Sequence, residues 1–417
     1  MTAPRPLFEF HLETNVKNPT RRLFLAAAIA VLPLLTLFSN ISCDFGKRDA
    51  YLAGYVEVPN PNAPIATEGA SWDEAMAMAE ADIPLRVGAV WKNDAILYRL
   101  GGLENKQSEA VSVYASGRDV FAAGHCEGKA TVWKNGTILY QLPENIEISE
   151  YGDCAEDVQL HVSEGDIYVL VNGKVYKNGL EHTTGGSARQ ICVVGKDLYV
   201  VSDWRNAKSN RTAEVWKNGA KLQLGTGKYL SVAMSVCAYG DDVYVAGGMV
   251  NSPREKAIAV VWKNGAALQL GNGKKKSLAS SVCVSGNDLY VSGIMEDDSG
   301  PGLEVTGSTR GERWWPDRGV VWKNGAVLLR HTNGSEDDKG SIQVLGEDVY
   351  VSRRGSVYKN DKELPGVRQF CISGKDVYLY GHDFDENHAP TIWKNDKVLY
   401  RIKDFSPSTW NGALFVK

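Results

Sequence analysis

The sequence lacks the short motifs that mark common catalytic sites. It contains no Gly-x-Ser-x-Gly, no His-Glu-x-x-His and no phosphate-binding P-loop. Its 7 histidines and its carboxylates follow no catalytic spacing. These absences remove the usual support for a hydrolase, a zinc protease or a nucleotide-dependent enzyme. We therefore expect a non-enzymatic protein with no catalytic residue and no cofactor.

An excess of basic residues is also missing. The chain has 46 Lys and Arg against 50 Asp and Glu, a net charge of -4, and it stays acidic when residues 1–42 are set aside. Such a charge gives no electrostatic reason to expect a nucleic-acid partner. A hydrophobic content of 43% with 42 glycines predicts a folded, turn-rich protein rather than a disordered one.

Only one long uncharged apolar run is present, from Leu23 to Ser39, and Lys17, Arg21 and Arg22 precede it. This order is typical of a signal peptide. The run is short for a spanning helix, which needs about 20 residues, and Pro33 interrupts it. A cleaved signal and a retained membrane anchor both fit residues 1–43. Either reading places residues 44–417 on the exported side of a bacterial membrane, periplasmic or at the surface.

Two details refine the export prediction. The stretch from Thr20 to Leu25 resembles a twin-arginine export signal, with ordinary unfolded export as the alternative. Ile41-Ser42-Cys43 resembles a bacterial lipoprotein cleavage box, although Asn40 stands where that box usually has an aliphatic residue. Cys43 is therefore the candidate lipidation site, and an uncleaved anchor or plain secretion are the alternatives.

The remaining chain is repetitive, and two elements alternate along it. The first is an aromatic residue followed by Lys and Asn, repeated about every 43 residues, at Trp91, Trp133, Tyr176, Trp216, Trp262, Trp322, Tyr358 and Trp393. The second is Asp followed by apolar, aromatic and apolar residues, at Asp49, Asp119, Asp166, Asp197, Asp242, Asp288, Asp348 and Asp376. Equal numbers and strict alternation indicate one structural unit repeated eight times.

Each unit reads as four short strands separated by turns. Asn-Gly pairs such as Asn264-Gly265 predict two-residue hairpins, since both residues of that turn need positive φ. The strands are apolar on both faces, which suits sheets packed face to face around an axis. We predict one all-β domain, a β-propeller of eight four-stranded blades, with seven as the alternative. Half-units at Asp49–Gly54 and Trp410–Lys417 should complete one blade and close the ring.

The repeat resembles the WKNG-type β-propeller repeats of uncharacterised exported bacterial proteins and lipoproteins. The resemblance covers residues 49–417, and its motif is the aromatic-Lys-Asn-Gly turn. It implies the propeller architecture, but that group has no shared activity to transfer.

The repeated Asp and Lys have two interpretations. The eight Lys residues would form a basic ring for an anionic partner, or each would pair with the Asp of its own blade. Antiparallel pairing places the start of the second strand beside the end of the third, so Asp can accept hydrogen bonds from the turn and pair with Lys. We predict the structural role.

The cysteines and one acidic loop are weaker candidates. Cys192, Cys237, Cys283 and Cys371 occupy equivalent positions in separate blades, so we expect buried free thiols. Cys126 and Cys154 fall in loops expected on one face, and they form a disulfide or remain unpaired. Asp383, Asp385 and Asn387 alternate like calcium ligands, but His388 replaces the required glycine, so a solvated acidic loop is the default.

Loop length carries the functional signal. The long segments are insertions at 55–85, where Ser71-Trp72-Asp73-Glu74 indicates a short helix, and at 294–318. The second insertion contains the binding candidates Arg310, Arg313, Trp314 and Trp315, residue types enriched in binding hot spots; packing on their own blade is the alternative. Trp204 is a further binding candidate.

These features predict an exported, membrane-tethered binding or assembly module. Its partner would be a protein or a membrane-protein complex, or else a glycan, bound through the long-loop face. The alternative function is a hydrolase or lyase with a site in the central funnel, which clustered carboxylates and histidines with shifted pKa values would favour.

Overall fold

The computed structural model describes residues 48–60, 84–101, 106–146, 158–182, 186–205, 211–224, 230–250, 257–270, 274–296, 317–331, 340–353, 355–402 and 413–417. The predicted signal segment with Cys43, the predicted capping box at Ser71 and the tryptophan pair at Trp314 lie outside the described residues. Every strand belongs to one compact unit, Asp49–Lys417.

The described strands form eight antiparallel sheets of four strands each, which we call blades 1 to 8. Within each blade, strands a to d run from the innermost to the outermost. Blade 1 consists of β32 (Ala413–Val416), β1 (Ala50–Val58), β2 (Leu85–Lys92) and β3 (Ala95–Arg99). Blade 2 consists of β4 (Ser108–Ser116), β5 (Asp119–Cys126), β6 (Lys129–Lys134) and β7 (Thr137–Asn145). Blade 3 consists of β8 (Gln159–Ser163), β9 (Asp166–Val171), β10 (Lys174–Lys177) and β11 (Leu180–His182). Blade 4 consists of β12 (Ser187–Val194), β13 (Asp197–Arg205), β14 (Arg211–Lys217) and β15 (Ala220–Leu222).

The second half repeats the same order. Blade 5 consists of β16 (Leu230–Tyr239), β17 (Asp242–Val250), β18 (Ile258–Lys263) and β19 (Ala266–Gln269). Blade 6 consists of β20 (Ser277–Ser285), β21 (Asp288–Glu296), β22 (Asp317–Lys323) and β23 (Ala326–His331). Blade 7 consists of β24 (Ile342–Leu345), β25 (Asp348–Arg353), β26 (Ser356–Lys359) and β27 (Lys362–Leu364). Blade 8 consists of β28 (Val367–Ser373), β29 (Asp376–Asp383), β30 (Ala389–Lys394) and β31 (Lys397–Arg401), with the short 3-10 helix η1 (Phe384–Glu386) between β29 and β30.

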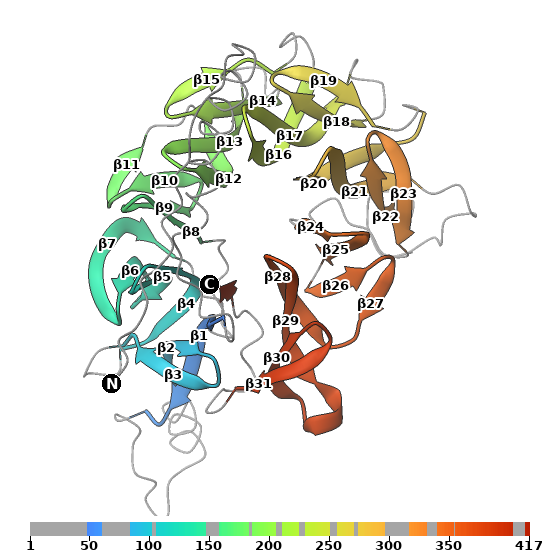
Figure 1. Ribbon diagram of the computed structural model, residues 1–417. Coiled ribbons are helices and arrows are strands. Elements are labelled where there is room, and N and C mark those ends of the chain that lie inside the picture. The colour runs from blue at the N-terminus through green and yellow to red at the C-terminus, as the bar shows by residue number, and fades with distance from the viewer. Residues whose placement is uncertain are drawn as a thin grey trace, which may run out of the picture. The chain divides into compact units, whose positions relative to one another are not determined.

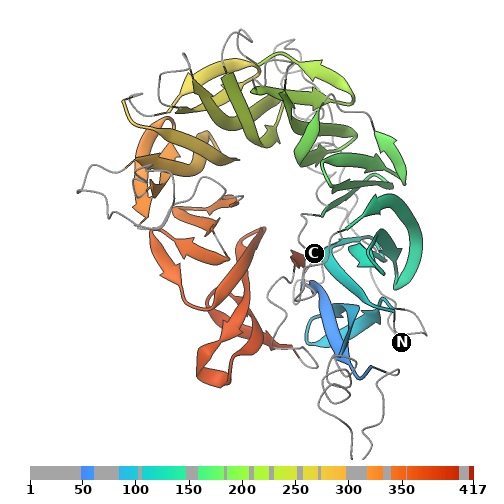
Figure 2. The same ribbon diagram turned by 180° about the vertical axis from the view of Figure 1, so that it is seen from behind.

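The blades follow one another around a ring (Figures 1 and 2). Each a strand contacts the a strand of the next blade, and β32 contacts both β4 and β28, so the circle is closed. Strand β32 pairs with β1 through Ala50↔Val416 and Leu52↔Leu414. The sequence prediction of eight blades closed by strands from both ends of the chain is therefore confirmed, and the seven-blade alternative is wrong.

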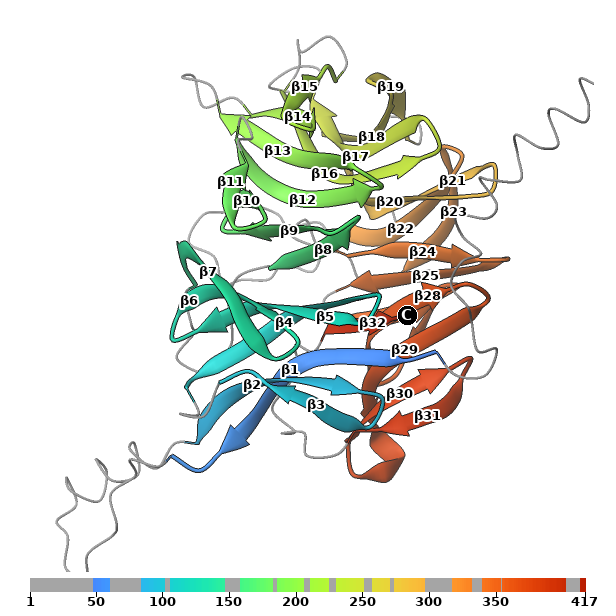
Figure 3. The same ribbon diagram turned by 60° about the vertical axis from the view of Figure 1, so that its left-hand side comes forward.

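The core consists of the interfaces between neighbouring blades, which stack face to face (Figure 3). The closing interface between blades 8 and 1 contains Leu52, Trp91, Tyr378 and Ile392, all fully buried. Burial of a large apolar side chain contributes about 1.5–3 kcal/mol. The closing interface is thus packed like the others, as strands that are apolar on both faces require.

Two-residue turns join strands c and d with the expected geometry. Asn264 and Gly265 have φ values of 49° and 85°, and both signs are positive as this turn type needs. In blade 8, Asn395 and Asp396 take the same conformation at φ 48° and 63°. The short turns between a and b also use glycine at positive φ, for example Gly286 at 60°.

The inner edges of several a strands are covered by glutamine side chains of the preceding blade. Each glutamine Oε1 accepts a hydrogen bond from an N–H group of the next a strand, in the pairs Gln159–Ile191, Gln190–Val236, Gln343–Ile372 and Gln369–Leu414, at 2.7–3.1 Å. An a strand has a neighbour strand on one side only, so these bonds satisfy groups that face the axis. They also link consecutive blades close to the centre of the ring.

Candidate binding face

Strand direction divides the ring into two faces. The a–b and c–d turns lie at one end of each blade, which we call the short-turn face. The b–c loops and the connections from d to the next a strand leave from the other end, which we call the long-loop face. Both predicted insertions leave from the long-loop face. Their bounds differ slightly from expectation, because Tyr55–Val58 extends β1 and Ile294–Glu296 extends β21.

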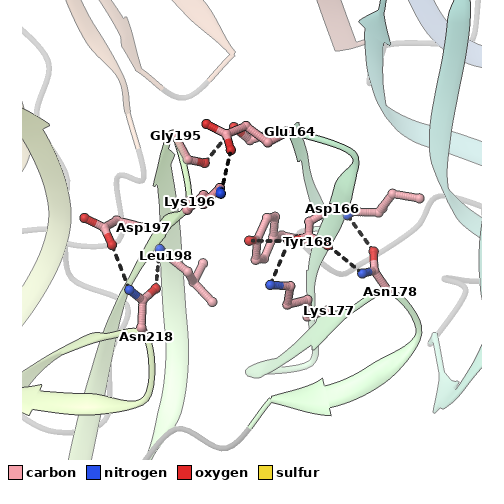
Figure 4. Close-up of polar contacts among 12 residues, drawn as sticks. Glu164, Asp166, Tyr168, Lys177, Asn178, Gly195, Lys196, Asp197, Leu198 and Asn218 are labelled. Atoms are coloured by element: carbon pink, nitrogen blue, oxygen red, sulfur yellow. Dashed lines mark hydrogen bonds and ion pairs between the residues drawn. The ribbon is translucent and has the colours of Figure 1, made fainter.

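The short-turn face carries the same side-chain arrangement in all eight blades, which we call the latch. The Asp at the start of strand b forms an ion pair with the Lys at the end of strand c, at Nζ–Oδ2 distances of 2.7–2.9 Å. The following Asn donates from Nδ2 to the same Asp, at 2.6–3.2 Å. Its Oδ1 accepts the N–H group of the residue after the Asp, as Asn178 does from Ile167 at 2.8 Å. Figure 4 shows the latch of blade 3 and, in blade 4, the contacts of Asn218 with Asp197 and Leu198.

The latch accounts for the repeated charges. Each Lys ammonium also lies 5.3–5.9 Å from the ring centroid of the aromatic residue on strand b. Hydrogen bonds from Lys134 and Asn135 hold the pKa of the Asp119 carboxyl below its ordinary value. The eight Lys charges are thus balanced within their own blades, and the predicted structural role of the Asp and Lys residues is confirmed.

The insertion that contains most of the predicted binding residues begins and ends on the long-loop face. Strands β21 and β22 stay paired up to Glu296↔Asp317, so the insertion begins and ends at neighbouring backbone positions. Trp314, Trp315, Arg310 and Arg313 lie outside the described residues. The Trp204 backbone lies opposite Thr212, near the long-loop end of β13 in blade 4. Blade 5 separates that position from the insertion of blade 6.

The acidic loop of blade 8 is held by the protein's own groups. Asp383 Oδ1 accepts the Asp385 N–H group at 3.2 Å, which caps η1, and Asp383 Oδ2 pairs with Arg401 at 3.3 Å. Asn387 has φ 53° and ends the short helix. Within the described ranges, no group of three or more His, Cys, Asp or Glu side chains is arranged to hold a metal ion. The calcium candidate Asp383, Asp385 and Asn387 therefore gains no support from the geometry.

One buried acid–base pair was not predicted from the sequence. Glu109 and His125 lie opposite each other on β4 and β5, with Oε2 and Nε2 3.9 Å apart and both side chains 2% exposed. Burial lowers the pKa of His125 to about 4, so the imidazole is neutral at pH 7. Both side chains are closed to solvent, so the pair is better suited to packing than to acid–base chemistry on a substrate.

Five cysteines lie in the described residues, and no disulfide joins any two of them. Cys192, Cys237, Cys283 and Cys371 are only partly buried, whereas the sequence predicted buried thiols. Burial raises the pKa of Cys237 to about 11. Cys126 is the last residue of β5 and is buried, not in a loop as the sequence suggested. Its predicted partner Cys154 lies outside the described residues, so that disulfide stays a prediction.

Among the residues that the structure covers, no helix is both long and apolar enough to cross a membrane. No protein-family model and no curated protein matches the sequence. Apo AztD from Citrobacter koseri is a similar solved structure, with a TM-score of 0.41 and 11% identity over 88% of this chain and 98% of that one. The β-propeller domain of the Trilobed protease from Pyrococcus furiosus has a TM-score of 0.36 and 12% identity over 72% and 99% of the two chains. Extracellular domains 1-2 of Drosophila Semaphorin 1a have a TM-score of 0.32 and 9% identity over 70% and 85%.

Proposed function

We propose that this chain is a non-enzymatic binding or assembly module, exported and held at a bacterial membrane by its N-terminal segment. Its long-loop face engages a protein or a membrane-protein complex, with a glycan as the other ligand class. We further propose that it belongs with the exported WKNG-repeat propellers that its sequence resembles.

The observation that supports this function is the difference between the two faces. The short-turn face repeats one self-neutralised latch in every blade. The long-loop face differs from blade to blade, from the two-residue turn Glu127-Gly128 in blade 2 to the segment between Glu296 and Asp317 in blade 6. A surface that recognises an asymmetric partner must itself be asymmetric, and loops on a rigid scaffold provide this.

The test of the binding proposal replaces the tryptophan pair. Full-length protein is purified from native membranes under mild detergent, and the co-purifying partner is identified by mass spectrometry. Trp314→Ala with Trp315→Ala should weaken binding by about 2 kcal/mol or more, because aromatic anchors dominate interface energy. Lys263→Ala, which removes one latch Lys, is the matched control and should leave binding unchanged. If the tryptophan variant unfolds while its folded fraction binds normally, the pair is packing and the proposal is wrong.

The tether has a separate test. We expect Cys43 to be the lipid-modified first residue of the mature protein, because it follows the apolar run directly and precedes β1 by a few residues. Intact-mass analysis of the membrane-extracted protein should show the loss of residues 1–42 and a diacylglyceryl mass on Cys43. If the N-terminal residues are retained and Cys43 is unmodified, the uncleaved anchor is supported. If the chain is cleaved and no lipid is found on Cys43, secretion is supported.

An enzymatic alternative is a hydrolase or lyase, and Glu109 with His125 is the observation in its favour. It ranks second because both side chains are 2% exposed. Turnover that survives the tryptophan substitutions and disappears in Glu109→Gln would reverse this ranking.

A further inference from the structure

The N-terminal segment joins the propeller at the short-turn face of blade 1. Strand β1 begins at Ala50, where every other blade has the start of strand b after its a–b turn. The Lys417 N–H group donates to the Asp49 carbonyl at 3.1 Å, which fixes this position beside the end of β32. Any attachment of the N-terminal segment to a membrane therefore acts at the short-turn face. The long-loop face lies at the opposite end of the same strands.

Charge is distributed unevenly over the short-turn face. The a–b turns of blades 8 and 2 carry exposed Lys375 and Arg118, and Lys417 occupies the corresponding place in blade 1. Lys417 Nζ also donates to the Gly117 carbonyl in the a–b turn of blade 2, which joins these neighbouring turns.

The remaining a–b turns differ. Blades 5 and 7 have exposed Asp241 and Glu347, and blade 6 has the uncharged Asn287. In blades 3 and 4, Glu164 pairs with Lys196 at 3.8 Å, so these turns balance each other (Figure 4). Because the latches are neutral, the turns decide the local charge.

The charged residues of the c–d turns offset the charge of the a–b turns only in part. Blade 1 has Asp94, while blade 8 has Asp396 followed by Lys397. The sector of blades 8, 1 and 2 therefore stays basic, although its net charge is small. The opposite sector stays acidic.

Exposed apolar side chains border the basic sector. Leu97, Ile138, Leu139 and Val398 are 37–45% exposed, and they lie two or three residues after the c–d turns of blades 1, 2 and 8. Blades 5 and 6 expose Leu268, Val327 and Leu328 on the same rim, but their a–b turns are acidic or neutral. Exposed apolar side chains also lie beside the short turns of blades 3, 4 and 5, at Leu180, Val194 and Tyr239. Among the described residues, blades 8, 1 and 2 are therefore set apart by their basic turns beside the attachment point rather than by apolar neighbours.

We propose that the short-turn sector of blades 8, 1 and 2 rests on an anionic phospholipid surface and directs the long-loop face away from it. This inference relies on the membrane tether of the proposed function. Basic residues close to an anionic leaflet are attracted to it, and a single lipid chain binds more stably when a basic patch assists it. The protein would then bind partners that approach from the aqueous side.

The test measures which side chains lie near lipid headgroups. Full-length protein is reconstituted into vesicles that contain phosphatidylglycerol and a headgroup-attached quencher. A fluorescent maleimide is placed by Ser116→Cys in blade 2, Ser285→Cys at the same position in blade 6, or Asp385→Cys on the long-loop face of blade 8. Labelling of the parental thiols is subtracted. Quenching should be at least twofold greater at residue 116 than at 285, and at 385 it should equal that of protein in detergent.

Charge reversal supplies the matched control. Arg118→Glu with Lys375→Glu should remove the excess quenching at residue 116, whereas Lys196→Glu, in the same turn position of blade 4, should not. Quenching at 385 that equals or exceeds that at 116 would overturn the proposed orientation, and equal quenching at 116 and 285 would overturn the sector. Release of the full-length protein by an alkaline carbonate wash would instead show that the tether itself is wrong.

Discussion

At the residue scale, the latch asparagine explains why the repeat is so regular. Asn324 accepts the Leu289 N–H group through Oδ1 at 2.8 Å and donates to Asp288 through Nδ2 at 2.7 Å. Its φ of 51° lies in the left-handed region, which asparagine tolerates better than most residues. One side chain therefore closes the turn, orients the Asp and leaves that Asp free to pair with Lys323 at 2.8 Å.

As the pH is lowered, the free energy of unfolding should fall in two steps, and each step arises from a different set of residues. Burial lowers the pKa of His125 and His161 to about 4 in the folded state. Unfolded histidine titrates near pH 6.5, so their contribution is complete above about 6.5 and is lost as the pH falls towards 4. Hydrogen bonds from Lys are the main cause that lowers the pKa of six latch Asp carboxyls, at Asp119, Asp166, Asp197, Asp242, Asp288 and Asp348. Their contribution to stability is therefore lost only below about pH 4, as the pH passes the folded pKa.

Denaturant unfolding between pH 8 and pH 3 measures both steps. His125→Gln should flatten the profile between pH 6.5 and 4, and Asp288→Asn should reduce the slope below pH 4 only. A profile that is flat from pH 7 to 4 in the parental protein would contradict the account of the buried histidines.

At the element scale, β32 is the strand on which ring closure depends. It buries Val416 and pairs with β1, and its Leu414 N–H group donates to Gln369 Oε1 at 2.8 Å. Deletion of residues 409–417 should lower the free energy of unfolding by several kcal/mol, because two interfaces lose apolar contacts and β1 gains an exposed edge. Gln369→Ala removes only the bond and should cost about 1 kcal/mol. A truncated protein whose Tm lies within a degree or two of the full-length value would show that closure contributes little.

Sequence reasoning predicted the elements well where the signal was local. The Asp-apolar-aromatic pattern and the c–d turns, which are Asn-Gly in five blades and Asn-Asp in blades 1, 7 and 8, define strands b and c, and these placed the latch correctly. The Glu109–His125 pair was missed because Ala110 and Ser112 oppose consecutive residues, which makes Val111 a bulge. Without that bulge Glu109 would lie opposite Cys126. A bulge of this kind depends on packing between blades and has no local sequence signal.

The glutamine bonds between blades were missed for a similar reason. They join residues about 30 to 45 positions apart, and they depend on how close neighbouring a strands lie at the axis. The hydrophobic pattern indicates that blades stack, but not at what distance. The binding residues on the second insertion stay predictions, since residue types alone suggested them.

At the scale of the whole molecule, the two faces differ: one repeats the same contacts in every blade, and the other, to which we assign the proposed binding, varies from blade to blade. The short-turn face holds eight equivalent latches and the attachment of the N-terminal segment, and both are constraints on the scaffold. The long-loop face carries no such repeated contacts among the described residues, so its segments can differ in length and chemistry. A rigid ring below variable loops is the arrangement that a recognition module needs.

Hydrogen–deuterium exchange of the full-length protein, alone and with its co-purified partner, tests the central claim most directly. We predict that partner binding slows exchange in peptides of the long-loop face, above all 297–316, and leaves the a–b turns around Gly117, Gly286 and Gly374 unchanged. Protection of those turns without protection of the long-loop peptides would contradict the assignment of the binding face.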